Sequence, residues 1–233
     1  MRKSGIDAAK SFVSEEFPNC DFAILAGSAS RGEETPSSDL DIVIFQGNSK
    51  GYRKSYELFD WRIEAFIHNY ESYLIEFERE RNIGRPILGN MITEGILLKE
   101  SNDYQNVKEN AYCHVTNGPT PLTDSYITAS RYFIGDLLDD FIDAKSNEEA
   151  LLTINNLSLQ VPDFILRLNN YWSGRGKGLT RALHSFDEKT YNNFFKSLEE
   201  YYKNNDKEPF IKFVKEVYDP IGGFLFEGYT TDK

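Results

Sequence analysis

Cysteine, positive charge and long apolar runs are all scarce in this sequence. Cys20 and Cys113 are the only cysteines among the 233 residues, and they lie far apart without metal-ligand spacing. This usage argues against a disulfide framework, and we expect a reducing, cytoplasmic location. No apolar stretch approaches the ~18 residues that a membrane-spanning helix needs, and residues 1–18 are too polar for a signal peptide.

The charge balance bears on the kind of partner. Lysine and arginine total 26 against 37 aspartates and glutamates, which gives a net charge of −11. Proteins that bind nucleic acid contact its phosphates with basic side chains, so nucleic acid is a disfavoured partner. A cationic small substrate suits the acidic chain better, although acidity can also serve solubility alone. The three histidines show no zinc-binding spacing.

The two halves of the sequence differ in their hydrophobic pattern. Up to about residue 100, helical stretches alternate with the β-rich runs CDFAILAG, LDIVIF, KSYELF, WRIEAFIH and GILLKE, which predicts a mixed α/β sheet. From about residue 123, apolar residues recur at helical spacing, which predicts an all-α bundle. The segment 117–124, NGPTPLTD, is the natural joint. We therefore predict an α+β domain at residues 1–116 and a helical domain at residues 123–233.

Two aspartates stand at the start of the second β-rich run. Residues i and i+2 of a strand share a face, so Asp39, Asp41 and Val43 point one way and the residues between them point the other way. Two neighbouring carboxylates repel each other, and removal from water increases the cost. A fold tolerates such a pair at a solvated strand end or around a bound cation. The first alternative, a plain strand start after the turn TPSSD, stays open at this point.

Two further segments favour the cation alternative. Gly27 and Ser28 follow an apolar run and can begin a short helix whose backbone N–H groups bind a phosphate, with Arg31 complementing its charge. Glu64 lies on the polar side of an alternating strand, and next to the strand of Asp41 it would join both aspartates. An ordinary turn at the glycine and a salt bridge of Glu64 with a neighbouring base are the plain alternatives.

Three carboxylates beside a phosphate-binding turn predict a defined chemistry. Mg²⁺ prefers oxygen ligands and is commonly held by carboxylates together with substrate phosphates. Two such ions neutralise a nucleoside triphosphate and stabilise the attacking and leaving oxygens of an in-line displacement. The pattern thus predicts a reaction in which an acceptor hydroxyl attacks a nucleotide phosphorus and pyrophosphate leaves.

These residues also resemble the motif of a known superfamily, the DNA polymerase beta-type nucleotidyltransferases. The matching positions are Gly27, Ser28, Arg31, Gly32, Ser38, Asp39 and Asp41, within residues 25–67. Glu64 matches the place of the third metal ligand, so the resemblance implies Mg²⁺ binding by Asp39, Asp41 and Glu64. It likewise implies nucleotide contacts for Gly27, Ser28, Arg31 and Ser38. More narrowly, the chain is similar to bacterial antibiotic nucleotidyltransferases with a helical C-terminal domain, which modify aminoglycosides and lincosamides.

The helical half adds three candidate residues, Lys177, Arg181 and Asp140. Arg175, Lys177 and Arg181 surround a glycine-rich loop that fits neither the Walker A pattern nor the dinucleotide-binding pattern. The resemblance implies that Lys177 contacts the triphosphate, with Arg181 as a second contact, whereas a solvated turn is the alternative. Asp140, at the edge of an apolar helix face, is the candidate general base, although such an acid often only borders a buried face.

These inferences give one preferred function and two rivals. We expect a Mg²⁺-dependent nucleotidyltransferase with ATP or another NTP as co-substrate, which moves AMP to a hydroxyl of a small molecule such as an aminoglycoside-like antibiotic. One rival is a nucleotidyltransferase that acts on protein or RNA. The other is a non-catalytic nucleotide-binding or antitoxin-like module. The sequence leaves both a monomer and a homodimer open.

Overall fold

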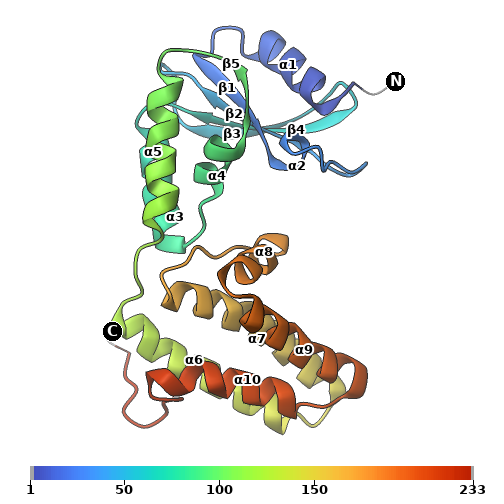
Figure 1. Ribbon diagram of the computed structural model, residues 1–233, viewed down its shortest axis with the longest axis vertical. Helices are drawn as coiled ribbons and strands as arrows, with labels where there is room; N and C mark the ends of the chain where they lie inside the picture. Colours follow the sequence, from blue (N-terminus) through green and yellow to red (C-terminus); the bar gives the residue numbers. More distant parts are fainter. Residues whose placement is uncertain (1–2, 232–233) are drawn as a thin grey trace. The chain divides into compact units, whose positions relative to one another are not determined.

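The structure of the protein is a computed structural model that describes residues 3–231 (Figure 1). The chain divides into two compact units, Met1–Gly118 and Pro119–Lys233. Each unit has hydrophobic core clusters of its own. Within the described range, no helix combines the length and the apolar composition that crossing a membrane requires.

The N-terminal unit is built on a five-stranded mixed sheet. Its strands are β1 (Phe22–Ala26), β2 (Leu40–Phe45), β3 (Tyr52–Leu58), β4 (Trp61–His68) and β5 (Ile96–Lys99). They lie in the order β3-β4-β2-β1-β5, with β2 and β4 parallel and the other neighbouring pairs antiparallel. Each β-rich run of the sequence forms one of these strands, so the predicted mixed sheet is confirmed.

Helices cover both faces of this sheet. The helices are α1 (Gly5–Glu16), α2 (Gly27–Ser30), α3 (Ser72–Ile83), α4 (Ile87–Glu94) and α5 (Tyr104–Asn117). Helix α1 packs on one face, and α3, α4 and α5 pack on the other (Figure 1). The alternation along β2 explains this layering, because Leu40 and Ile42 belong to the core under α1 whereas Val43 and Phe45 belong to the opposite core. The sequence pattern predicts helical stretches at residues 3–17 and about 70–82, which are α1 and α3, but it does not predict α4 or α5.

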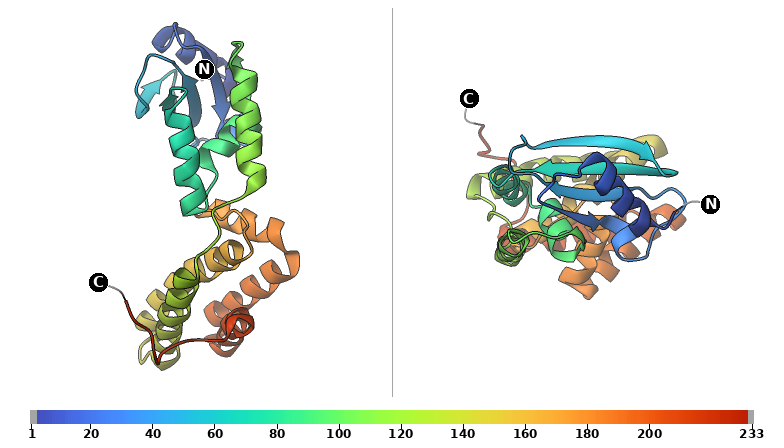
Figure 2. Two further views of the ribbon diagram at one scale, coloured as in Figure 1. Left: turned by 90° about the vertical axis from the view of Figure 1, so that its left-hand side faces the viewer. Right: turned by 90° about the horizontal axis from the view of Figure 1, so that it is seen from above.

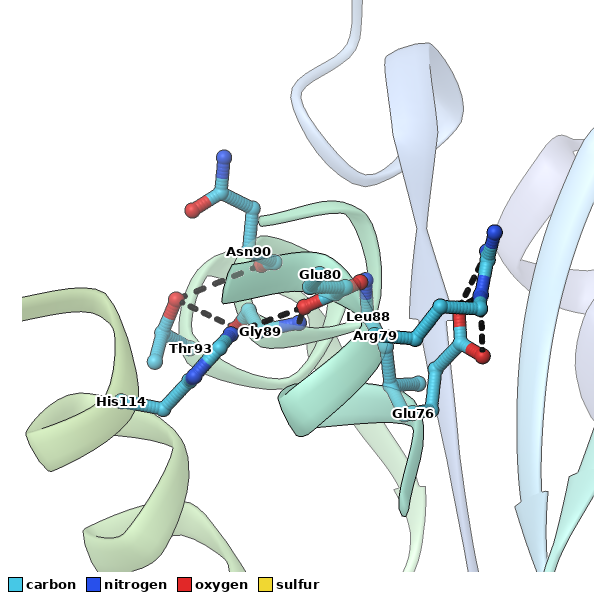
Figure 3. Close-up of polar contacts among 8 residues, drawn as sticks. All are labelled: Glu76, Arg79, Glu80, Leu88, Gly89, Asn90, Thr93 and His114. Atoms are coloured by element: carbon cyan, nitrogen blue, oxygen red, sulfur yellow. Dashed lines mark hydrogen bonds and ion pairs between the residues drawn. The ribbon is translucent and has the colours of Figure 1, made fainter. Parts of the chain in front are cut away.

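A buried carboxylate holds α4 against its neighbours. Glu80 on α3 is fully buried, and it accepts hydrogen bonds from the backbone N–H groups of Leu88 and Gly89 in the first turn of α4 (Figure 3). Nε2 of His114, on α5, lies 2.9 Å from the same carboxylate. The first turn of a helix has N–H groups without partners inside the helix and favours negative charge. Glu80 therefore fastens three helices together at one point.

The C-terminal unit is helical throughout its regular part. Its helices are α6 (Asp124–Asp143), α7 (Asn147–Leu168), α8 (Lys177–Phe186), α9 (Glu188–Asn204) and α10 (Glu208–Tyr218), followed by the short 3-10 helix η1 (Asp219–Ile221). Helix α6 packs on α7, and α9 packs on α10 (Figure 2). Phe141, Leu157 and Phe210 are fully buried in the shared core. The Thr123 hydroxyl accepts from the N–H of Tyr126 and so caps α6. The predicted helical second half is confirmed.

Candidate active site in the N-terminal unit

The parallel pairing of β2 with β4 brings two of the predicted acids together. Asp41 and Glu64 are direct register partners in this pair and point to the same face of the sheet. Asp39 immediately precedes β2, two positions before Asp41, and is partly buried. The neighbouring residues Ile63 and Ala65 belong to the opposite core, so the alternation fixes the direction of Glu64. The three acids therefore gather where β2 begins.

The environment of Asp41 disfavours its negative charge. Burial is the largest cause, and the nearby negative charges of Asp39 and Glu64 add to it. Together they raise the pKa of the Asp41 carboxyl to about 6, against the opposing effect of Arg53 and Arg31. Repulsion of this kind is relieved either by a proton or by a cation. The electrostatics of the cluster therefore suit a bound positive ion.

The turn after β1 lies directly against Asp41. Gly27 begins α2 with a φ of 72°, a backbone conformation that side chains other than glycine rarely adopt. A Cβ atom at this position would lie 2.2 Å from Oδ2 of Asp41, which is far inside van der Waals contact. Glycine is thus required twice, by the backbone conformation and by the close approach. Through this contact the two parts of the sequence motif, the turn at Gly27 and the acid Asp41, lie side by side.

Ser28 and Ser38 tie this turn to the loop before β2. The Ser28 hydroxyl donates to the Ser38 hydroxyl over 3.3 Å, and Ser38 Oγ accepts from the N–H of Thr35 at 2.9 Å. Ser28 thus connects the start of α2 with the segment that delivers Asp39. These contacts give both serines a positioning role in the loop, and their predicted contacts with a nucleotide stay predictions.

Arg31 forms ion pairs with two neighbouring acids, Glu33 and Glu94. Its Nε donates to Glu33 over 3.0 Å, and its Nη1 lies 4.0 Å from Glu94 at the end of α4. The guanidinium is about one third exposed, so solvent screens both contacts. The predicted phosphate contact of Arg31 would require an exchange of these partners, and it stays a prediction.

Sequence reasoning missed Arg53, which contacts the acidic cluster directly. Its Nη2 donates to the Glu64 carboxylate, and its guanidinium carbon lies 4.9 Å from the centroid of the Phe66 ring. The predicted strand began at Lys54, whereas β3 begins at Tyr52 and pairs Arg53 with Phe66. An extension of the alternating pattern by two residues would have placed Arg53 on the face of Glu64.

Asp41 and Glu64, but not Asp39, line a cleft of about 600 Å³ on the same face of the sheet. Asp41 and Glu64 line one end, and Glu76 on α3 adds a third carboxylate to the wall. Phe66, Ile87 and Met91 supply apolar surface. Clefts that combine apolar walls with a few charged groups are the usual form of small-molecule sites. This cleft, contained within the N-terminal unit, is the candidate binding site.

The donor set of the acidic cluster matches a hard divalent cation. Asp39, Asp41 and Glu64 offer carboxylate oxygens, the ligands that Mg²⁺ prefers, and the negative charges of Asp39 and Glu64 beside Asp41 favour a cation there. Within residues 3–231, however, no three acid, histidine or cysteine side chains lie close enough to hold an ion as they stand. The Glu64 carboxylate is turned to Arg53 instead. The three carboxylates therefore suit a divalent cation in their chemistry. Glu64 would have to exchange Arg53 for the ion before it could act as the third ligand.

The remaining candidates belong to the C-terminal unit. Lys177 is the first residue of α8, and Arg181 follows one turn later. Both side chains are exposed, as is Asp140 on α6. Gly176, just before α8, has a φ of 52°, so the glycine-rich loop includes a conformation that favours glycine. The roles of Lys177, Arg181 and Asp140 stay predictions.

Comparison with known families bears on the N-terminal unit. Residues 6–85 match the model of the nucleotidyltransferase domain family. Residues 6–85 of the N-terminal unit form a nucleotidyltransferase domain. This domain match includes α1, β1 to β4 and every acid of the cluster, and it confirms the predicted superfamily. The match supports a nucleotidyltransferase enzyme, with a nucleoside triphosphate as substrate.

Two further comparisons add little to this assignment. No curated protein matches the chain. Among solved structures, a nucleotidyltransferase-like protein from Exiguobacterium sibiricum 255-15 is similar, with 13% sequence identity and a TM-score of 0.46. The alignment covers 93% of this chain and 73% of the other.

Proposed function

We propose that the protein transfers AMP from ATP to a hydroxyl group of a small molecule, with Mg²⁺ as the metal. One observation carries this proposal. In a nucleotidyltransferase domain, the register of β2 and β4 sets Asp41 beside Glu64, and the Gly27 turn lies against Asp41. The juxtaposition of a glycine turn and crowded carboxylates is what a metal-assisted phosphoryl-group transfer requires.

The proposal assigns a task to each group of residues. Asp39, Asp41 and Glu64 hold two Mg²⁺ ions, which when bound offset the charge of the triphosphate and stabilise the attacking and leaving oxygens. The absence of a side chain at Gly27 leaves room for the Asp41 carboxylate, and the backbone N–H groups of the Gly27–Ser28 turn are proposed to bind a phosphate beside it. Arg31, Ser38, Lys177 and Arg181 are proposed as further contacts of the nucleotide.

The transfer itself is an in-line displacement. The acceptor hydroxyl oxygen forms a bond to the α-phosphorus of ATP, and the bond from that phosphorus to the bridging oxygen of pyrophosphate breaks. The hydroxyl proton passes to a carboxylate, for which Asp140 is the proposed general base. Pyrophosphate leaves with the electron pair of the broken bond. Correct placement of the acceptor is the main task of the protein in such a reaction.

A cationic acceptor fits the charge of the chain and of the cleft. The protein carries a net charge of −11, and the cleft wall includes three acids, Asp41, Glu64 and Glu76, against two arginines, Arg53 and Arg79. Acidic surfaces raise the local concentration of cationic ligands. We therefore propose a polyhydroxylated amine, of which aminoglycosides are one kind, as the first acceptor class to test.

An assay of labelled transfer tests the proposal. The full chain is incubated with α-phosphate-labelled ATP, Mg²⁺ and a panel of acceptors that starts with aminoglycosides, and the release of pyrophosphate and the labelled product are followed. We expect metal-dependent transfer by the wild type and by Glu78→Gln, an exposed α3 control, and none by Asp39→Asn. Label found on protein or RNA instead would overturn the acceptor class. Absence of transfer together with absence of nucleotide binding would identify a non-catalytic module.

A further inference from the structure

An arginine stands where the acidic cluster would receive a cation. Arg53 reaches from the edge strand β3 across the ring of Phe66 to the carboxylate of Glu64. Its side chain is 56% exposed and that of Glu64 is 26% exposed, so the pair lies at an open edge of the cleft. Within the described residues, this is the ion pair that the structure shows for the three acids.

The pair can exchange partners at little cost. Ion pairs with this degree of exposure contribute little to stability because water competes for both charges. A divalent ion that takes the Glu64 carboxylate therefore displaces the guanidinium easily. The backbone of Arg53 stays in place, because β3 is paired with β4 from Tyr52 to Leu58. The displaced guanidinium thus remains at the mouth of the cleft.

We propose that Arg53 is a phosphate-binding residue that holds Glu64 until a divalent ion takes this carboxylate, and then binds a phosphate group of the nucleoside triphosphate. The inference rests on the proposed function. A guanidinium presents a planar fork of donors that matches phosphate oxygens. Arg79, the other arginine that lines the cleft, is held by Glu76 of its own helix through contacts of 2.6 to 3.1 Å (Figure 3). Arg53 therefore supplies the positive charge on the sheet side.

Two titrations on one variant test this exchange. In Arg53→Gln, Mn²⁺ alone, followed by electron paramagnetic resonance, should bind about threefold or more tightly, because a competitor for Glu64 is gone. In the presence of Mn²⁺, the non-hydrolysable ATP analogue AMPCPP, followed by calorimetry, should bind about tenfold more weakly because a charge-assisted contact is lost. Arg53→Lys, which keeps the charge but not the fork, should fall between the wild type and Arg53→Gln.

The control is Lys54→Gln. Lys54 is the next residue of β3, its ammonium lies 4.5 Å from the Tyr56 ring, and its alternation places it on the other face of the sheet. The same charge is removed from the same strand, so general electrostatic effects appear in both variants. Shifts in Arg53→Gln no larger than those in Lys54→Gln would overturn the inference. Weaker binding of both Mn²⁺ and AMPCPP would also overturn it, since that is the result of structural damage. No AMPCPP binding by the wild type would remove the proposed function, and this inference with it.

Discussion

Two carboxylates of the N-terminal unit, Glu80 and Asp41, are both withdrawn from water but have opposite surroundings. Glu80 accepts from two backbone N–H groups at the start of α4 and lies 2.9 Å from His114. Asp41 stands among Asp39 and Glu64, and its pKa is raised to about 6 by burial and by their charge. The surroundings of Glu80 satisfy its charge, whereas those of Asp41 leave its charge in excess.

We propose that this difference separates a structural acid, Glu80, from a functional one, Asp41. Burial of a charge is costly unless donors or opposite charges compensate for it. At Glu80 the chain itself supplies that compensation, and the result is a fixed junction of α3, α4 and α5. At Asp41 the charges of Arg53 and Arg31 offset burial and repulsion only in part, and we propose that a bound cation supplies the rest. Buried polar residues that destabilise a fold are often retained because a ligand needs them.

The largest expected effect is the loss of activity in Asp41→Asn. The amide keeps the size of the side chain but removes a negatively charged oxygen that we propose as a metal ligand. The rate of transfer should fall by about 10³-fold or more, because loss of metal-supplied charge stabilisation amounts to several kcal/mol. Steady-state rates with saturating ATP and Mg²⁺ provide the measurement. A rate within tenfold of the wild type would contradict the assigned role.

Glu80→Ala should cause the largest loss of stability. The substitution removes the acceptor of the N–H groups of Leu88 and Gly89 and the partner of His114, all at a buried site. The free energy of unfolding should fall by about 3 kcal/mol. Urea denaturation compares this variant with Glu78→Ala, an exposed change on the same helix that should alter stability by less than about 0.5 kcal/mol. Equal stabilities would show that the junction is unimportant.

Asp41→Asn should change stability in the opposite direction from Glu80→Ala. Removal of the charge relieves its repulsion with Asp39 and Glu64, so the free energy of unfolding at pH 7 should rise by about 1–2 kcal/mol. The expected rise is smaller than the free energy that corresponds to the full pKa shift, because Asp41 is only partly buried and solvent screens its charge. Denaturation in EDTA, without divalent ions, makes the measurement. A destabilised variant would mean that the Asp41 carboxylate is compensated within the chain.

The smallest effect concerns pH. The folded-state pKa of Asp41, about 6, lies above its ordinary value of 3.8, so the folded state binds more protons between these values. The contribution of Asp41 to stability should therefore improve as the pH falls from 7 through 6 toward 4. Subtracting the profile of Asp41→Asn from that of the wild type isolates this contribution, because other carboxylates titrate in both. A flat difference profile in EDTA would contradict the raised pKa.

Local patterns predicted much of the acidic face but not its partners. Alternation in β2 and β4 correctly placed Asp41 and Glu64 on the polar side of their strands. Pairing of β2 with β4 joins residues far apart in the chain, so the sequence analysis could place Glu64 beside Asp41 only on the assumption that their strands are neighbours. Arg53 was missed because the predicted strand began two residues too late, at Lys54 instead of Tyr52.

The same limit applies to Glu80 and to the helices around it. In the sequence Glu80 looks like any acid of a charged helix, EFERERN, and its burial depends on the arrival of α4 from later in the chain. Helix α4 itself has only the residues Ile87–Glu94, too few for a clear helical period. Burial of this kind is decided by packing between elements rather than by the local sequence.

The central claim is that Asp39, Asp41 and Glu64 of the N-terminal unit bind a divalent cation that the nucleotide needs. Calorimetric titration of AMPCPP, with Mg²⁺ or with EDTA, tests this claim most directly. The samples are the wild type, the double variant Asp39→Asn/Asp41→Asn and the control Glu78→Gln. We predict binding that requires Mg²⁺ in the wild type and the control, and loss of this binding in the double variant. Binding that is equal with Mg²⁺ and with EDTA, or that persists in the double variant, would contradict the account.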